Sequence, residues 1–272
     1  MKKDLKDVTF IIPIRIDSLD RIRNLFSSIL YIISNFDTNI IVKELGDHSH
    51  YRDDVVPLLE QVFDEIPVEY IFEETSESVF HKTKILNELS ALVKTDICVS
   101  YDCDVILPVD SYVEARRMVV EDGVDLVYPY GFNEHYDPVN GYAKLVDYND
   151  ETLNSFYEGD FSLDTLLKRS QTVHARYGYC QFYRLSTFRK AGEWSEKFVS
   201  FGAEDEEFYY RFKTLGYNVQ RINEFVYHLN HSRDTAFWFQ NSNPHLSSNE
   251  ELWSAIKNMD RDQLIKFYGL DL

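Results

Sequence analysis

Two pairs of side chains in this sequence have the chemical types and spacing of ligands for a divalent metal. Asp102 and Asp104 stand on either side of a cysteine, directly after an apolar run. His228 and His231 are three residues apart, at the end of another apolar run. Carboxylate oxygens suit Mg²⁺ or Mn²⁺, and imidazole suits several transition metals. A metal held by such residues could bind a diphosphate, so the pattern suggests transfer of a group that leaves on a diphosphate.

An acidic cluster between these pairs has the features of an acid–base centre. Glu204 and Asp205 follow the segment Phe201-Gly202-Ala203 and begin a run of four acidic residues. Acidic residues also suit the start of a helix, because the helix dipole favours negative charge there. One carboxylate in this position could take a proton from an attacking hydroxyl, and its neighbour could bind the acceptor.

Each motif has an ordinary structural explanation when it is taken alone. Aspartates are common turn residues, and a single histidine at a strand end is usually part of the core or the surface. An EF-hand is excluded, because the glycine and the distal glutamate that it requires are missing after Asp102. Asp102 and Asp104 nevertheless follow a predicted buried strand, where α/β proteins bind their ligands. The residues Ser232-Arg233-Asp234 after the second histidine add an arginine that suits bidentate phosphate binding.

The first 130 residues alternate between patterns typical of strands and patterns typical of helices. Apolar, β-branched runs predict strands at residues 8–14, 39–45, 68–72, 96–101 and 125–130. Apolar residues at helical spacing predict helices at residues 20–35, 51–64, 82–93 and 111–121. This alternation favours an α/β fold with a mostly parallel central sheet flanked by helices.

The second half of the chain is less regular. Residues 133–174 are rich in Tyr, Asp and Asn, which indicates an insertion or lid with one helix near residues 163–170. Further strands are predicted at residues 179–184, 219–222 and 226–228, and helices at residues 186–191, 205–215 and 249–268. No linker rich in Pro, Gly or Ser divides the sequence. We therefore expect one domain over residues 1–272, with a nucleotide-binding half (1–130), an acceptor and metal half (131–234) and a helical tail (235–272).

Composition narrows the classes of partner. The net charge of −18 repels nucleic-acid phosphates, so nucleic acid is not expected as the main partner, although a metal could still recruit an anionic nucleotide. The longest apolar runs fall far short of the ~20 residues that a membrane span needs. The three cysteines have no paired spacing, and the charged N-terminus is not a secretory signal. These features predict a cytoplasmic protein without an integral membrane segment.

The order of the motifs resembles the metal-dependent β-1,4-galactosyltransferase family and its bacterial capsule-type relatives. The similar segments are IPIR, the helix KTKILNE, DCD, FGAEDEEFYYRF and HLNHSRD, within residues 8–234. GAED followed by Glu, and HSRD, are the most specific of them. This resemblance implies the GT-A glycosyltransferase fold.

The resemblance also implies roles for individual residues. Asp104, His228 and His231 would bind Mn²⁺ or Mg²⁺, with His228 standing where the animal enzymes have a methionine. Asp205 would be the catalytic base, and Glu204 and Phe201 would contact the acceptor. Donor contacts would come from Pro13, Arg15, Lys84, Asp102, Gly202 and Arg233. Phe201 replaces a tryptophan of the family, which keeps an aromatic face but removes the indole N–H. One or both of the segments Phe201-Gly202-Ala203 and 133–174 are expected to be mobile without ligand and to become ordered when donor and metal bind.

The reaction implied by the resemblance is an inverting transfer of a hexose from a UDP-sugar to a hydroxyl of a glycan or glycolipid. The product would belong to a surface polysaccharide or a virion glycan, made in a bacterial or virus-infected host cytosol. Alternatives are a retaining or otherwise different nucleotide-sugar transferase on the same fold, a non-catalytic nucleotide- or glycan-binding domain, or a metal phosphohydrolase. A binding domain would need no base, so the presence of Glu204 and Asp205 beside the metal set argues against it.

Overall fold

The main sheet occupies the centre of the protein, whose computed structural model describes residues 1–77, 79–131, 143–174, 177–231 and 243–272. Its seven strands are arranged in the order β10-β6-β9-β4-β1-β2-β3. Their bounds are β1 Lys3–Ile14, β2 Phe36–Gly46, β3 Val68–Glu74, β4 Ile97–Tyr101, β6 Leu126–Tyr128, β9 Cys180–Arg184 and β10 Val219–Arg221. All of these strands overlap the runs that the sequence pattern predicts.

The main sheet is mixed, whereas the sequence favours a mostly parallel one. Four of its six strand pairings are parallel, and the two pairings made by β9 are antiparallel. Between β6 and β9 the chain forms β7 and β8 of a second sheet and two helices. It re-enters the main sheet at the end where β6 leaves it, so β9 runs antiparallel to β6.

A second, four-stranded sheet has the order β5-β11-β7-β8. Its strands are β5 Val105–Ile106, β7 Ala143–Val146, β8 Ser170–Val173 and β11 Val226–Leu229. Of these only β11 overlaps a predicted strand: all four of its residues are buried, whereas β7 and β8 are partly exposed and β5 has only two residues. The described part of the predicted lid, residues 143–174, is therefore regular structure, with helices α5 (Asp150–Glu158) and α6 (Leu163–Lys168) between β7 and β8. Residues 133–142 of that prediction lie outside the described residues.

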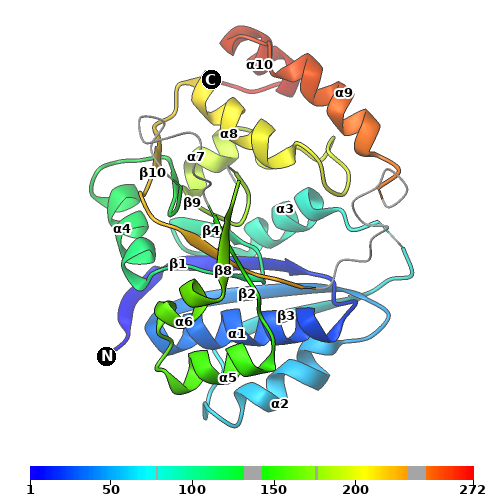
Figure 1. Cartoon of the computed structure of the whole chain (residues 1–272). Helices are drawn as coiled ribbons and strands as arrows, with labels where there is room; N and C mark the ends of the chain where they lie inside the picture. Colours follow the sequence, from blue (N-terminus) through cyan, green and yellow to red (C-terminus); the bar gives the residue numbers. More distant parts are fainter. Residues whose placement is uncertain (78, 132–142, 175–176, 232–242) are drawn as a thin grey trace.

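Helices lie on both sides of the main sheet (Figure 1). The remaining ones are α1 Leu19–Asn35, α2 Val56–Leu59, α3 Lys82–Leu92, α4 Val109–Val120, α7 Leu185–Lys190, α8 Glu204–Leu215, α9 Leu246–Ile256 and α10 Arg261–Tyr268. In Figure 1, α1, α2, α5 and α6 lie on one side of β1 and β2, and α3 and α8 lie on the other with α9 and α10 beyond. The helix predicted at residues 51–64 is shorter, since a π-helical turn (Tyr51–Val55) precedes α2 and the helix ends at Leu59.

The core is continuous and rich in aromatic rings. Phe10 on β1 contacts Tyr101, Tyr112 and Phe182 at ring-centroid distances of 5.5–6.1 Å, and all four side chains are buried.

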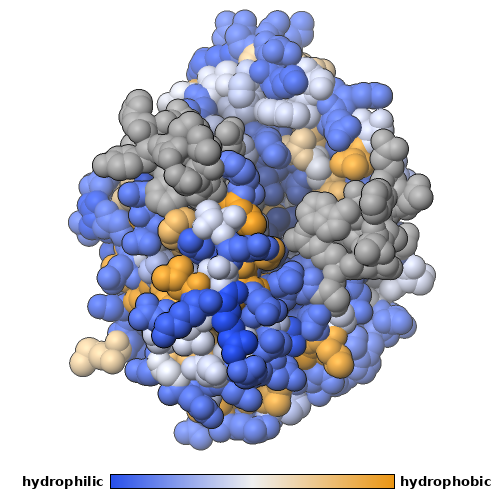
Figure 2. Space-filling model, viewed as in Figure 1, coloured by the Kyte–Doolittle hydropathy of each residue, from blue (hydrophilic) through white to orange (hydrophobic). Residues whose placement is uncertain are grey.

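The cysteines Cys98, Cys103 and Cys180 are free and buried. Within the described ranges, no helix combines the length and the apolar character that crossing a bilayer requires. Figure 2 shows mainly hydrophilic residues on the viewed face, with small scattered apolar patches.

Candidate metal centre and catalytic cleft

A cleft of about 600 Å³ brings together most of the residues that the sequence singles out. It lies at the carboxyl ends of β1 and β4, where an α/β fold is expected to bind its ligands. Ten of the predicted site residues line it: Pro13, Arg15, Asp102, Asp104, Phe201, Gly202, Glu204, Asp205, His228 and His231. Lys84 is not among the lining residues, and Arg233 lies outside the described part of the chain.

Asp104, His228 and His231 form one compact buried group. Oδ2 of Asp104 lies 3.5 Å from Nε2 of His228 and 3.2 Å from Nε2 of His231. Each residue is at most 8% exposed, and one ligand atom from each lies within 4.8 Å of the others. Burial alone would raise the pKa of the Asp104 carboxyl. The two imidazoles have the larger effect and hold this pKa well below its usual range. The donor set of two imidazoles and one carboxylate fits a divalent metal.

Strand pairing explains how residues more than a hundred positions apart meet. β5 follows Asp104 directly and pairs with β11, so that His228 lies opposite Val105. The main-chain N–H of Leu229 donates to the carbonyl oxygen of Asp104 at 2.8 Å. The short β5–β11 ladder therefore fixes the distance between the Asp and His segments.

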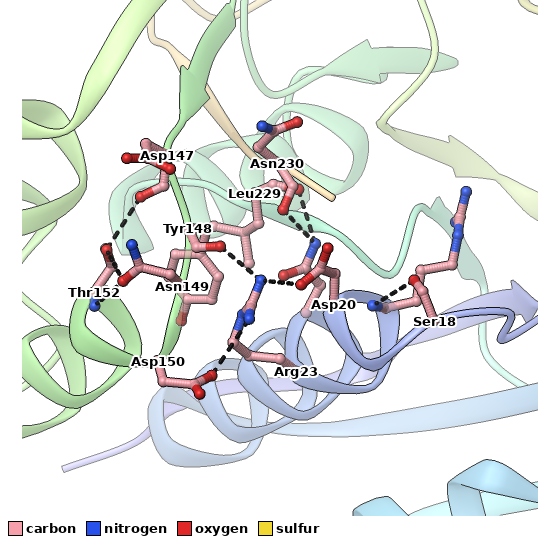
Figure 3. Close-up of polar contacts among 12 residues, drawn as sticks. Ser18, Asp20, Arg23, Asp147, Tyr148, Asn149, Asp150, Thr152, Leu229 and Asn230 are labelled. Atoms are coloured by element: carbon pink, nitrogen blue, oxygen red, sulfur yellow. Dashed lines mark hydrogen bonds and ion pairs between the residues drawn. The ribbon is translucent and has the colours of Figure 1, made fainter. Parts of the chain in front are cut away.

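Helix α1 braces the turn that carries the two histidines. Nδ2 of Asn24, which is fully buried, donates to the carbonyl oxygens of Leu229 at 2.8 Å and Asn230 at 3.3 Å. Next to it, Arg23 donates to the carbonyl of Tyr148 at 2.6 Å and pairs with Asp20 and Asp150, as Figure 3 shows. α1 is thus attached both to the end of β11 and to the segment between β7 and α5.

Lys82 is a functional candidate that the sequence interpretation missed. Its Nζ lies 2.9 Å from Oδ1 of Asp102 in the cleft, and its side chain is 18% exposed. Burial lowers the pKa of Lys82, but the carboxylates of Asp102, Asp205 and Glu204 outweigh burial and raise it above its ordinary value.

Lys84, the predicted donor ligand, lies on another side of α3. Its side chain is 55% exposed, and its Nζ is 3.9 Å from Oε1 of Glu88. A helix turns by about 100° per residue, so side chains two positions apart point in nearly opposite directions. The structure therefore brings Lys82 to the cleft in place of Lys84.

Asn87, also on α3, holds the loop before α8, since it exchanges hydrogen bonds with the main chain of Trp194.

Asp205 projects from the first turn of α8 into the cleft. A Cβ at Gly178 would lie 2.8 Å from its Oδ2, and Gly178 has a φ of +70°, so this close approach requires a glycine. Burial raises the pKa of Asp205 to about 8, with Glu204 and Asp102 acting in the same direction and Lys82 opposing. From the sequence we expected the helix start to favour the ionised carboxylate. In the cleft burial outweighs the helix dipole, and the two nearby carboxyl groups add to the rise in the pKa of Asp205.

The segment before α8 has an unusual backbone. Ser200, Gly202 and Ala203 all have positive φ values, which strains the two residues other than glycine. Oε2 of the buried Glu204 accepts a hydrogen bond from the amide of Gly202 at 2.6 Å. Burial raises the pKa of Glu204. Glu204 therefore stabilises the turn that presents Phe201, and ordering of this segment on ligand binding stays a prediction.

Comparison with known proteins identifies the fold only. No family model matches the sequence, and no curated protein matches it significantly. The fold is similar to that of a mannosyltransferase from Pyrobaculum calidifontis, solved in complex with GDP-Man and Mn²⁺. The TM-score is 0.56 and the identity 14%, over 96% of this chain and 67% of the mannosyltransferase chain. The chain therefore has a mixed α/β fold that is also found in a glycosyltransferase.

Proposed function

We propose that the protein is an inverting, metal-dependent glycosyltransferase that moves a hexose from a UDP-sugar to a glycan or glycolipid hydroxyl. One observation carries the proposal: a buried group of Asp104, His228 and His231 lines the same cleft as Asp205. Metal ligands and a carboxyl group that can accept a proton, gathered in one cleft, are the two parts that such a transfer needs. The shared fold with a sugar-nucleotide transferase supports this conclusion.

Asp104, His228 and His231 would hold Mn²⁺ or Mg²⁺, which supplies positive charge to the leaving diphosphate when bound. Pro13 and Arg15 end the first strand and would contact the nucleotide. Asp102 would lie beside the sugar and the ribose, and Gly202 beside the donor. The role proposed for Lys84 passes to Lys82, whose ammonium group lies in the cleft. Arg233 keeps its proposed role as a phosphate ligand.

The chemical step assigns the proton to Asp205. The acceptor hydroxyl oxygen forms a bond to the anomeric carbon, and the bond from that carbon to the diphosphate oxygen breaks. The hydroxyl proton moves to the ionised carboxylate of Asp205, and a single displacement inverts the anomeric configuration. Glu204 and Phe201 would position the acceptor, Glu204 by fixing the turn and Phe201 through its aromatic face.

A GDP-sugar is the second candidate donor, because the similar mannosyltransferase was solved with GDP-Man. UDP and GDP differ in the nucleobase and share the diphosphate, so the phosphate and metal chemistry of the cleft suits either donor. A role in surface polysaccharide or virion glycan synthesis follows from the sequence resemblance and forms part of the proposal.

Nucleotide release from a panel of sugar nucleotides tests the proposal. With Mn²⁺ present, UDP or GDP should be released from one donor, faster with an acceptor glycan than without it, and EDTA should stop the release. The product anomer, determined by NMR, distinguishes inversion from retention. Release that no acceptor stimulates would indicate a phosphohydrolase, and binding without release would indicate a non-catalytic domain.

A further inference from the structure

A second group of potential metal ligands follows β2, outside the cleft. His48, His50, Asp53 and Asp54 lie within seven consecutive residues. Nδ1 of His50 is 2.7 Å from Oδ2 of Asp54, and Nε2 of His48 is 3.3 Å from Oδ2 of Asp53. The two imidazole rings have centroids 4.7 Å apart. None of these residues lines the cleft, so the group is separate from the site described above.

Buried polar contacts hold the backbone beneath this group. The carboxylate of Glu44, which is 1% exposed, accepts the amide N–H groups of His50 at 3.1 Å and Tyr51 at 3.0 Å. It also accepts the hydroxyl of Tyr70 at 2.6 Å, and that hydroxyl lies 2.7 Å from Oγ of Ser49. Because buried Ser49 turns inward, its neighbours His48 and His50 are left on the outer side of the segment.

The π-helical turn at Tyr51–Val55 brings the carboxylates under the two imidazoles. His50 already has helical angles, with φ −65° and ψ −36°, and the amide of Asp53 donates to the carbonyl of Ser49 at 3.1 Å. Asp54 is therefore one turn after His50 on the same side. Single π-helical turns occur frequently at functional sites. The ligands are thus presented by a fixed backbone, which lowers the entropy cost of binding an ion.

We propose that His48, His50 and Asp54 form a second metal site, for a divalent metal cation such as Zn²⁺. One ligand atom from each residue lies within 4.8 Å of the others. Ligand atoms about 2.0–2.2 Å from an ion must approach one another somewhat more closely than that. The half-exposed side chain of His48 can rotate to close this gap. Three protein ligands leave a coordination position for water or an incoming ligand, and Asp53 can accept a hydrogen bond from a metal-bound water.

Zinc stoichiometry tests the second site, because both candidate sites have two imidazoles and one carboxylate. Equilibrium dialysis at about 10 µM free Zn²⁺ should give two ions per wild-type chain. His231→Ala and His50→Ala should each bind one ion, and the double variant none. His245→Ala, which changes a histidine outside both groups, should still bind two. Circular dichroism of each variant verifies that the chain is folded.

Two results would overturn the second site: His231→Ala binding no zinc, or the double variant still binding one ion. If the cleft group binds no metal, wild type would bind one ion and His50→Ala none. That outcome would reject the metal of the proposed function and leave the second site supported. His48→Ala provides an independent check, since loss of either imidazole should weaken zinc binding by at least about tenfold.

Discussion

The ammonium nitrogen of Lys82 lies 2.9 Å from Oδ1 of Asp102, and this ion pair joins α3 to the end of β4. The pair sits in the cleft with Asp205, whose pKa is raised by burial, lowered in part by the positive charge of Lys82 and raised further by Asp102. Lys82 thus favours the ionised form of the proposed base, in addition to any contact with the donor phosphates.

Replacing Lys82 with Met should therefore change both the rate and its pH dependence. Without the ammonium group the pKa of Asp205 rises, so the pH at which kcat/KM reaches half its maximum should move to higher pH. Lys82→Arg keeps the positive charge and should retain a profile close to that of wild type. Lys84→Met is the matched control, because it removes a lysine from an exposed side of the same helix. A profile of Lys82→Met that coincides with wild type would show that Lys82 does not act on the base.

The second prediction concerns the buried group of Asp104, His228 and His231. His231→Ala leaves the Asp104 carboxylate with one imidazole, so Mn²⁺ affinity should fall more than about tenfold, and Mn²⁺-dependent nucleotide release should fall with it. Removing metal from wild type with EDTA should have the same effect, reversed by added Mn²⁺. His174→Ala serves as the control, since His174 lines the cleft but belongs to neither candidate metal group. Mn²⁺ binding followed by EPR measures the affinity, and equal binding by His231→Ala and wild type would contradict the assignment.

How far the sequence predicts this site depends on the kind of interaction. The strands of the main sheet are buried apolar runs, so hydrophobic pattern alone finds them, and Asp104 at a strand end follows from the topology. Strands β5, β7 and β8 exist because of partners far along the chain, with few residues to form a pattern. β5 nevertheless aligns the metal group, because its pairing with β11 places His228 beside Asp104.

Lys82 and Asp205 show two properties that a sequence motif does not determine: the direction of a side chain and the pKa of a buried group. The resemblance pointed to Lys84 on α3, but the direction of a side chain depends on how the helix rotates against the sheet. That rotation places Lys82, not Lys84, in the cleft. The pKa of Asp205 depends on enclosure by Gly178 and on two nearby carboxyls, which no local sequence pattern reports.

Asn24 is predicted to act on metal binding through the main chain. Asn24→Asp keeps the size of the side chain but loses the N–H donor, and it places a negative charge against the carbonyls of Leu229 and Asn230. The turn between the two histidines should loosen, and Mn²⁺ affinity should fall about tenfold. Asn35→Asp is the matched control, since Asn35 lies on the same helix and also donates to a main-chain carbonyl.

Thermal unfolding separates this effect of Asn24→Asp from general destabilisation. Both variants should lose some stability, because each removes a hydrogen bond, but only Asn24→Asp should lose metal affinity. Mn²⁺ affinities within about twofold of each other in the two variants would show that Asn24 has no positioning role.

Asp205→Asn carries the sharpest prediction, because it should lower activity and raise stability together. Asparagine cannot accept the acceptor proton, so kcat should fall about 100-fold or more. Burial raises the pKa of Asp205 from 3.8 to about 8 on folding. The stability that this raised pKa contributes is complete below pH 3.8 and is lost as the pH rises through 8. Because Asn does not ionise, the Tm of the variant should exceed that of wild type by a margin that grows between these pH values.

Scanning calorimetry of the metal-free proteins measures the margin. Asp262→Asn changes an exposed aspartate in the first turn of α10 and controls for the helix dipole. A Tm difference independent of pH would show that Asp205 is not enclosed as described, and kcat within about threefold of wild type would remove it as the base.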